Sequence, residues 1–337
     1  MRWTTNTERD VFFWRRGLAD IVVATDIQVY FSSSGRLFSS RQVKAVDGVS
    51  IAIAESETLA LVGESGCGKT TLGRSLLRLV ELTGGEVEFS GESVNRMNRR
   101  ELRGFRRNAQ AIFQDPYSSM SPYMTVREIV EEPLKIHGID GSVDEVLKRV
   151  NLEPTGQISA KYPHNLSGGQ RQRVSVARAL TLSPKFIVAD EPVSMVDASN
   201  RVEILSLLRE LQSDRGIAFL YITHDIASAR HFSDRIAVMY LGVVVETGES
   251  ELLVENPNHP YTKGLLAAVP EPRASNRTRL RETIAGELPN AADVPTGCPF
   301  HPRCPSAIPG RCDTIRPEPV TLKDGREISC HLFTERN

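Results

Sequence analysis

A glycine-rich stretch at residues 63–71, with the letters GESGCGKTT, constrains the fold more than any other part of the chain. It has the full spacing G-x-x-x-x-G-K-[ST] of a phosphate-binding loop. The apolar run Thr58–Val62 precedes it and predicts a buried strand, while Leu72, Leu76 and Leu79 follow it at helical spacing. A glycine-rich turn that merely opens a helix would need neither the full spacing nor the strand.

Strand, loop and helix together predict a site for a nucleoside triphosphate. The glycines let backbone N–H groups turn toward an anion, and the new helix points its positive end at the same place. We expect Lys69 to reach the outer phosphates and the Thr70 hydroxyl to ligate Mg²⁺. The residues expected to surround ATP here are Gly63, Glu64, Ser65, Gly66, Cys67, Gly68, Lys69, Thr70 and Thr71.

Charge and hydropathy exclude several classes of protein. The formal net charge of −1 over 337 residues offers no electrostatic argument for nucleic acid as a partner. The longest apolar run, Ile236–Val245, is about half the length that a membrane helix needs. No signal peptide is evident near the start of the chain. We therefore expect a protein at the cytoplasmic side of the membrane, held there peripherally by partners.

The pattern of elements predicts an α/β fold with a parallel-sheet core. Alternating strands and helices imply parallel strands with helices on both faces. Residues 21–23 and 27–31 form two short β-rich segments, followed by a Ser/Gly loop at 32–40. Residues 43–46, 49–53 and 86–89 alternate as antiparallel strands do, which predicts a smaller antiparallel subdomain. Residues 115–180 show helical patterns without a long strand, so we expect a helical subdomain inserted between two core strands.

A second chemical feature is the apolar strand 186–189, which ends in Asp190 and Glu191. Ligands of such sheets bind at the carboxyl ends of the strands, so these acids should lie beside the phosphate loop. We expect Asp190 to hold Mg²⁺ and Glu191 to take a proton from an attacking water. Two acids that only end a strand are the alternative, which the phosphate loop disfavours.

The stretch 166–170, with the letters LSGGQ, lies between the phosphate loop and the acidic strand. It resembles the signature sequence of ATP-binding cassette (ABC) transporter ATPases. The resemblance implies a P-loop ATPase in which Ser167, Gly168, Gly169 and Gln170 close over ATP bound to a second subunit. At the start of a helix, such residues make another anion-binding device.

The same resemblance assigns the remaining stations of the site. Gln114 matches the glutamine that contacts Mg²⁺ and the attacking water, and His224 matches the histidine that contacts the γ-phosphate. Asp197 matches the aspartate of the loop after the acidic strand, although two neighbouring apolar positions differ from the usual family form. Either Tyr30 or Phe31 would stack on adenine, and we favour Phe31.

The last part of the chain is similar to the ending of dipeptide and oligopeptide importer ATPases, most closely the second, "F-type", ATPase subunit. The carriers of this similarity are the segments 255–262, 286–289 and 297–300. It implies a motor for peptide uptake, with nickel or oligosaccharides as alternative cargoes. We predict an N-terminal extension at 1–20, an ATPase domain at 21–255 and a loop-rich C-terminal region at 256–337.

Four of the five cysteines, Cys298, Cys304, Cys312 and Cys330, crowd into this C-terminal region. Their spacing lacks a C-x-x-C pair, which weighs against a common zinc site. Four thiolates suit an iron–sulfur cluster, and the family that the chain resembles is thought to hold a [4Fe–4S] cluster here. Zinc and free thiols remain alternatives.

The resemblance implies several partners: a second ATPase subunit in a heterodimer, two membrane-spanning permease subunits and an extracytoplasmic solute-binding protein. An exporter ATPase is one alternative, which the C-terminal region disfavours. A soluble ABC protein acting in DNA repair or on ribosomes is another. Those proteins carry long coiled coils or two cassettes, whereas this chain shows one cassette and no sustained heptads.

Overall fold

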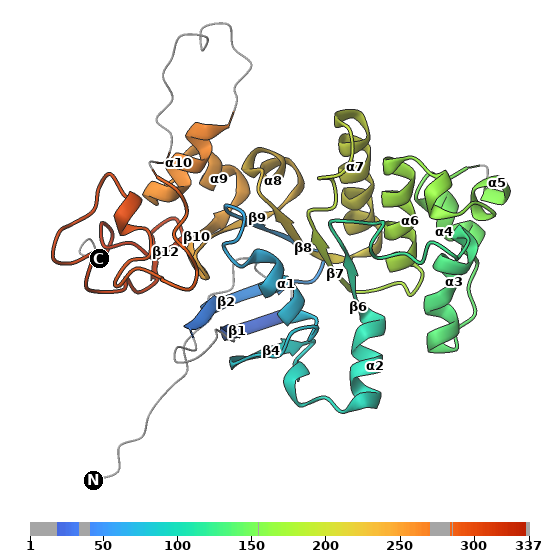
Figure 1. The fold of residues 1–337 in the computed structure, drawn as a ribbon, viewed down its shortest axis with the longest axis horizontal. Helices are drawn as coiled ribbons and strands as arrows, with labels where there is room; N and C mark the ends of the chain where they lie inside the picture. The colour runs from blue at the N-terminus through green and yellow to red at the C-terminus, as the bar shows by residue number, and fades with distance from the viewer. Residues whose placement is uncertain (1–18, 34–40, 154, 270–283, 285, 335–337) are drawn as a thin grey trace, which may run out of the picture.

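The protein is built from a large, mostly parallel sheet with helices on both faces and a smaller antiparallel sheet beside it (Figure 1). The computed structural model describes residues 19–33, 41–153, 155–269, 284 and 286–334. The predicted N-terminal extension lies outside the described residues except for its last two positions, and the first strand already begins at Asp20.

In the described residues the large sheet has eight strands in the order β11-β12-β10-β9-β3-β8-β7-β6. Strands β9, β3, β8, β7 and β6 are parallel to one another, as the sequence predicted, while β10, β12 and β11 add antiparallel strands at one edge. Their bounds are β3 (Thr58–Val62), β6 (Ala109–Ile112), β7 (Phe186–Asp190), β8 (Ala218–Thr223), β9 (Arg235–Tyr240), β10 (Val243–Glu249), β11 (Val320–Thr321) and β12 (Glu327–Ile328).

Strand β3 shows why its sequence is continuously apolar. Leu59 and Leu61 face one hydrophobic core, Ala60 and Val62 face the other, and all four are fully buried. Because side chains alternate across a strand, a strand covered on both faces needs apolar residues at every position. The strand that leads into the phosphate loop is therefore anchored at the centre of the molecule.

The small sheet has the strand order β2-β1-β4-β5. Its strands are β1 (Asp20–Ser33), β2 (Arg41–Ala54), β4 (Gly84–Phe89) and β5 (Glu92–Ser93). The sequence indicated two short β segments within residues 21–31, but the structure joins them into one long strand. The register shifts between Ala24 and Ile27, where Asp26 adopts a positive φ of 51°. Such a bulge bends a strand without ending it.

Helices cover the sheets and fill the chain between β6 and β7. They are α1 (Lys69–Leu76), α2 (Arg99–Asn108), α3 (Val126–His137), α4 (Val143–Arg149), α5 (Thr155–Ser159), α6 (Gly168–Leu180), α7 (Ala198–Arg215), α8 (Ile226–Phe232), α9 (Ser250–Glu255) and α10 (Pro260–Ala268), with short 3₁₀ turns η1 (Val94–Arg96), η2 (Pro163–Asn165) and η4 (His301–Arg303). Helices α3 to α6 lie at one end of the molecule, and the C-terminal region lies at the other (Figure 1).

The C-terminal region is joined to the core by a strand pair that its loop-rich sequence did not predict. Glu246 of β10 pairs with Ile328 of β12, so the hairpin β11–β12 extends the large sheet. Each of these two strands is only two residues long, too short for a detectable alternation. β12 is a strand because it pairs with the edge of β10, and β11 is a strand because it pairs with β12. The local sequence pattern specifies neither.

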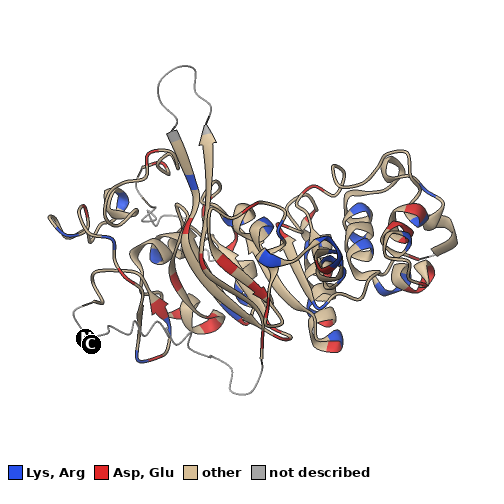
Figure 2. Ribbon diagram, turned by 90° about the horizontal axis from the view of Figure 1, so that it is seen from below, with Lys and Arg blue, Asp and Glu red and all other residues tan. Residues whose placement is uncertain are grey.

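Acidic and basic positions are interspersed along the ribbon (Figure 2). The described part of the chain contains no helix that is both long and apolar enough to cross a bilayer.

Candidate functional site

The phosphate loop leaves β3 and enters α1, as predicted, and two of its glycines are required by the surrounding backbone. A Cβ atom on Gly63 would lie 2.2 Å from the carbonyl oxygen of Met239. One on Gly68 would lie 2.0 Å from that of Ala45, and Gly68 has a φ of 106°. Glycine alone fits a left-handed backbone that passes so close to another chain segment.

Lys69 folds back over the loop that precedes it. Its ammonium donates hydrogen bonds to the carbonyl oxygens of Gly63 (2.7 Å) and Glu64 (2.9 Å), and the residue is 6% exposed. A buried positive charge at a helix start favours a bound anion. Cys67 fills the space beneath the loop, and burial raises the pKa of its thiol, so a filling role accounts for this side chain.

Two of the predicted Mg²⁺ ligands lie together. The Thr70 hydroxyl donates to Asp190 Oδ1 at 3.1 Å. Burial raises the pKa of Asp190, and the hydrogen bond from Thr70 opposes that shift. A hydroxyl and a carboxylate side by side are the hard oxygen donors that Mg²⁺ prefers, so these residues fit the ion.

Glu191 follows Asp190 and lies between two other predicted site residues. Gln114 donates from Nε2 to Glu191 Oε2 at 2.9 Å, and His224 Nδ1 lies 3.1 Å from Glu191 Oε1. The neighbouring order of β8, β7 and β6 explains this meeting, because each of the three residues follows one of these strands at its carboxyl end. Among the contacts of the described residues, the Gln114 amide is hydrogen-bonded to the predicted base Glu191. Within this described part of the chain it makes no hydrogen bond to the predicted Mg²⁺ ligands Thr70 and Asp190, which bond to each other.

The backbone of Glu191 has a strained conformation. Its φ is 44°, a left-handed value that is uncommon for a residue with a side chain. Its N–H donates to the carbonyl oxygen of Ile222 at 2.9 Å, which holds the turn against β8. The side chain is only 14% exposed. Strained and enclosed backbone of this kind is found preferentially at functional sites.

The signature residues begin α6 and form a local cap. The Ser167 hydroxyl accepts the Gln170 N–H at 3.2 Å, while the Gln170 side chain accepts the Ser167 N–H at 3.1 Å. Ser167 is exposed, and Gly168 is partly so. A Cβ on Gly169 would lie 2.9 Å from the Asn200 side chain, so the starts of α6 and α7 adjoin. Within the described residues, the side-chain hydrogen bonds of Ser167 and Gln170 stay inside this cap.

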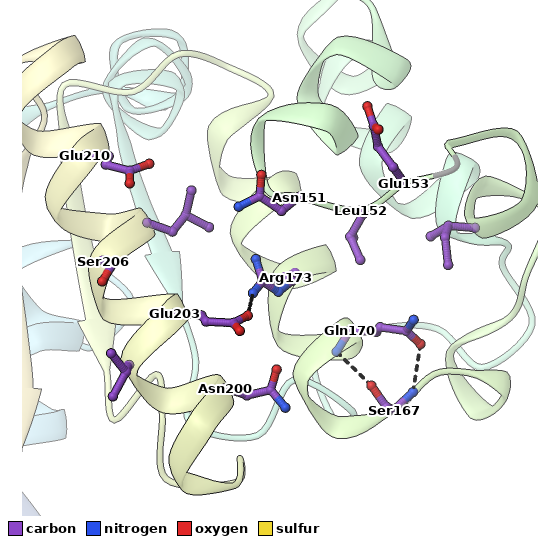
Figure 3. A pocket seen from close by; sticks show the side chains of 13 residues that line it. Asn151, Leu152, Glu153, Ser167, Gln170, Arg173, Asn200, Glu203, Ser206 and Glu210 are labelled. Atoms are coloured by element: carbon purple, nitrogen blue, oxygen red, sulfur yellow. Dashed lines mark hydrogen bonds and ion pairs between the residues drawn. The ribbon is translucent and has the colours of Figure 1, made fainter.

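A groove of about 670 Å³ opens beside the signature, between α6 and α7 (Figure 3). The ion pair between Arg173 and Glu203 spans it, and Ser167, Gln170 and Asn200 lie toward one end. Asp197, the predicted residue of the neighbouring loop, is exposed and caps α7 by accepting the Asn200 N–H at 3.0 Å. This groove is separate from the phosphate loop.

The two candidates for stacking on adenine, Tyr30 and Phe31, differ in the contacts and the exposure of their rings. The Tyr30 hydroxyl donates to Asp47, and the Lys44 ammonium lies 5.3 Å from the centre of the Tyr30 ring. Phe31 is 45% exposed. An exposed flat ring can accept a base on its face, so this arrangement favours Phe31.

The four late cysteines are free thiols, and three of them are buried. Burial raises the pKa of Cys298 and Cys330 to about 11, and the charges of Cys304 and Cys312 add to the shift at both positions. The thiols therefore influence one another electrostatically. In the described part of the chain, however, no group of three or more His, Cys, Asp or Glu side chains is arranged to hold a metal ion.

The sequence missed two residues that hold the phosphate loop from the C-terminal side. The guanidinium of Arg303 donates two hydrogen bonds to the Glu64 carboxylate, and the Tyr261 hydroxyl accepts the Glu64 N–H at 2.9 Å. Nothing in a linear motif places residue 303 beside residue 64. Tyr261 was visible only as part of the segment 255–262.

This fold and this site together define an ABC transporter ATPase. A family model described as ABC transporter matches residues 46–194, and one described as oligopeptide/dipeptide transporter, C-terminal region, matches residues 245–312. The chain belongs to the family of ABC transporter ATP-binding proteins, as the sequence predicted.

Its similarity to individual proteins extends over most of its length. It is 48% identical to the putative oligopeptide transport ATP-binding protein YkfD of Bacillus subtilis over 302 residues, covering 87% of this chain and 91% of YkfD. It is 43% identical to the oligopeptide transport ATP-binding protein AppF of the same organism over 325 residues, covering 93% and 98%.

Among solved structures, the chain is similar to a dimeric, post-hydrolysis form of the ATP-binding cassette MJ0796 bound to ADP and Pi. The TM-score is 0.60 at 30% identity, and the match covers 68% of this chain and 98% of that one. The predicted P-loop ATPase fold is thus confirmed.

Proposed function

We propose that the protein is the ATP-hydrolysing subunit of an importer that takes up dipeptides or oligopeptides. The observation that carries the proposal is the meeting of Gln114, Glu191 and His224 beside the phosphate loop. The names of YkfD and AppF and the match of the C-terminal region support a peptide as the cargo over nickel or an oligosaccharide.

The chemistry follows from the positions of the side chains. The phosphate loop and Lys69 bind the triphosphate of ATP, and Phe31 stacks on the adenine. Mg²⁺, held by Thr70, Asp190 and Gln114, would neutralise phosphate charge when bound. Glu191 is the general base that takes a proton from water, and Gln114 and His224 orient its two carboxylate oxygens.

The exposed signature supports a head-to-tail pair of ATPase subunits. Ser167, Gly168, Gly169 and Gln170, together with Asp197, would complete an ATP site on a second subunit. We propose a heterodimer at the cytoplasmic face of the membrane, docked on two permease subunits that receive solute from an extracytoplasmic binding protein. The contact surface for the permeases would be the helical segment that follows Gln114, with its helices α3 to α6.

The variant Glu191→Gln tests the assignment of the base. The amide keeps the size of the side chain and one accepting oxygen but cannot take a proton, so we expect hydrolysis to fall by about 100-fold or more. ATP binding should persist. Phosphate release by the wild type and the variant, each assembled with its permeases and binding protein in peptide-loaded vesicles, measures the change. A variant that hydrolyses ATP at the wild-type rate would remove Glu191 from this role.

For the cysteines, we propose a [4Fe–4S] cluster held by Cys298, Cys304, Cys312 and Cys330. Their free thiols and the burial of three of them support the proposal, while the absence of a preformed metal-ion group among the described residues weighs against it. Protein purified without oxygen should absorb visible light in the sulfur-to-iron bands and contain iron and sulfide. A colourless sample that contains stoichiometric zinc would contradict the cluster and indicate a zinc site instead.

A further inference from the structure

The C-terminal region contacts the phosphate loop through a charged pair that the proposed catalytic machinery does not use. Arg303 Nη1 donates to Glu64 Oε2 at 2.7 Å, and Nη2 donates to Glu64 Oε1 at 3.0 Å. The side chain of Arg303 is 6% exposed and that of Glu64 is 29% exposed. Two parallel bonds between a guanidinium and a carboxylate fix both distance and orientation.

The guanidinium is held in place by its own surroundings. Its Nη2 also donates to the carbonyl oxygen of Gly286 at 3.0 Å, and its central carbon lies 5.9 Å from the centre of the Tyr240 ring. Phe300, three residues earlier, packs edge-on against the same ring. Because these contacts come from both the sheet and the C-terminal region, packing fixes the position of the Arg303 guanidinium beside Glu64.

Glu64 is also held through its backbone. Its N–H donates to the hydroxyl of Tyr261, which lies in the first turn of α10 and packs against Tyr240. One residue of the phosphate loop is thus fixed at its side chain and at its main chain by groups that lie 239 and 197 residues away in sequence.

The charge of Glu64 makes this contact matter for nucleotide binding. Glu64 directly follows Gly63 and precedes Lys69, so its carboxylate belongs to the loop that receives an anion. An unpaired carboxylate there would repel the triphosphate, and partial burial leaves such repulsion less screened than at an open surface.

We propose that Arg303 is a positioning residue for the ATP site: it neutralises Glu64 and fixes its loop, so the C-terminal region sets the ATP affinity of its own subunit. The inference rests on the proposed function, because it concerns ATP bound at the phosphate loop. It gives the C-terminal region a task in nucleotide binding that is separate from any metal chemistry of its cysteines.

A mutant cycle tests the proposal through the equilibrium binding of ATP to the full chain, measured by calorimetry. Arg303→Ala should weaken ATP binding by about tenfold when Glu64 is present. In the Glu64→Gln background the same change should weaken binding by less than about twofold, because no unpaired carboxylate is left. Arg303→Lys, which keeps the charge but not the fork, should fall between the wild type and Arg303→Ala.

Arg235→Ala is the matched control. Arg235 pairs with the buried Glu57 at 3.2 Å, next to the amino end of β3, whereas Glu64 follows the carboxyl end of that strand. Its loss should lower the melting temperature without changing ATP affinity.

Two results would overturn the proposal. One is an Arg303→Ala chain that binds ATP as the wild type does. The other is an equal loss with and without the Glu64 carboxylate, which would reduce Arg303 to a structural contact. If the wild-type chain itself failed to bind ATP, the proposed function would fail, whereas a wild type that binds and an unaffected variant would reject this inference alone.

Discussion

The chain contains two anion-binding loops that open a helix, and they are built in opposite ways. The phosphate loop, residues 63–71, is held by distant parts of the chain, although Ser65 and Gly66 are exposed. Backbone carbonyl oxygens leave no room for a Cβ atom at two of its glycines, and Arg303 and Tyr261 hold Glu64. The signature, residues 166–170, is open: Ser167 is exposed, and a local cap satisfies its hydrogen bonds.

The difference shows which part of the site one chain can complete. A loop held by other segments has its shape before a ligand arrives, because those surrounding atoms have already ordered it. An exposed helix start leaves backbone N–H groups at the surface, where an anion carried by another molecule can reach them. We therefore expect the phosphate loop to depend on internal packing and the signature to depend on a second subunit.

The largest expected effect is the loss of ATP binding in the variant Gly68→Ala, which changes the phosphate loop and not the signature. Gly68→Ala would place a Cβ atom 2.0 Å from the carbonyl oxygen of Ala45, at a φ of 106°. The clash and the unfavourable backbone conformation can be relieved only if the loop moves. ATP binding should therefore weaken by about 100-fold or more, which corresponds to about 2.7 kcal/mol. Titration of the purified chain with ATP measures it.

Two alanine variants serve as controls for Gly68→Ala. Gly91 has a φ of 80° but no atom within 4 Å of its Cβ position, so Gly91→Ala isolates the cost of the backbone conformation and should keep ATP affinity. For Gly169→Ala, the atoms nearest the new Cβ belong to the Asn200 side chain, and the residue stands in a helix, where alanine is favoured by about 1 kcal/mol. It should leave ATP binding by the isolated chain unchanged. Equal losses in all of these variants would erase the contrast between the loops.

A smaller effect should appear with pH, in the segment that holds the phosphate loop through Tyr261. Burial lowers the pKa of His259 to about 3, and its Nδ1 accepts the Tyr261 N–H at 3.0 Å. The unfolded chain takes up a proton near pH 6.5 while the folded chain does not, so stability is lost as pH falls below that value. Between pH 7 and pH 5 the loss from this group should be about 2 kcal/mol.

Urea unfolding at both pH values measures that loss. His259→Asn keeps a capping acceptor but does not titrate, so its stability should change less between pH 7 and pH 5 by the same amount. Comparison with the wild type also cancels the opposing influence of Glu246, whose pKa burial raises. An identical pH dependence of the two proteins would show that His259 is not the titrating group.

Much of the fold was predictable because it follows local periodicity. The buried strand Thr58–Val62 shows in the sequence as a continuous apolar run, and the helices on both faces show as apolar residues at helical spacing. The long strand β1 was not predictable as one element, because a bulge at Asp26 changes the direction of the side chains in its middle.

By itself, the sequence determined the chemistry: a loop in which glycine is required, acids at the end of a buried strand, and a capped helix start carrying the signature. Each is a local pattern in which residue type and spacing limit the backbone directly. Tertiary structure alone decided that β12 would pair with β10 and that Arg303 would reach Glu64, 239 residues earlier. Such contacts depend on the paths of loops through space, and no periodicity in the chain records those paths.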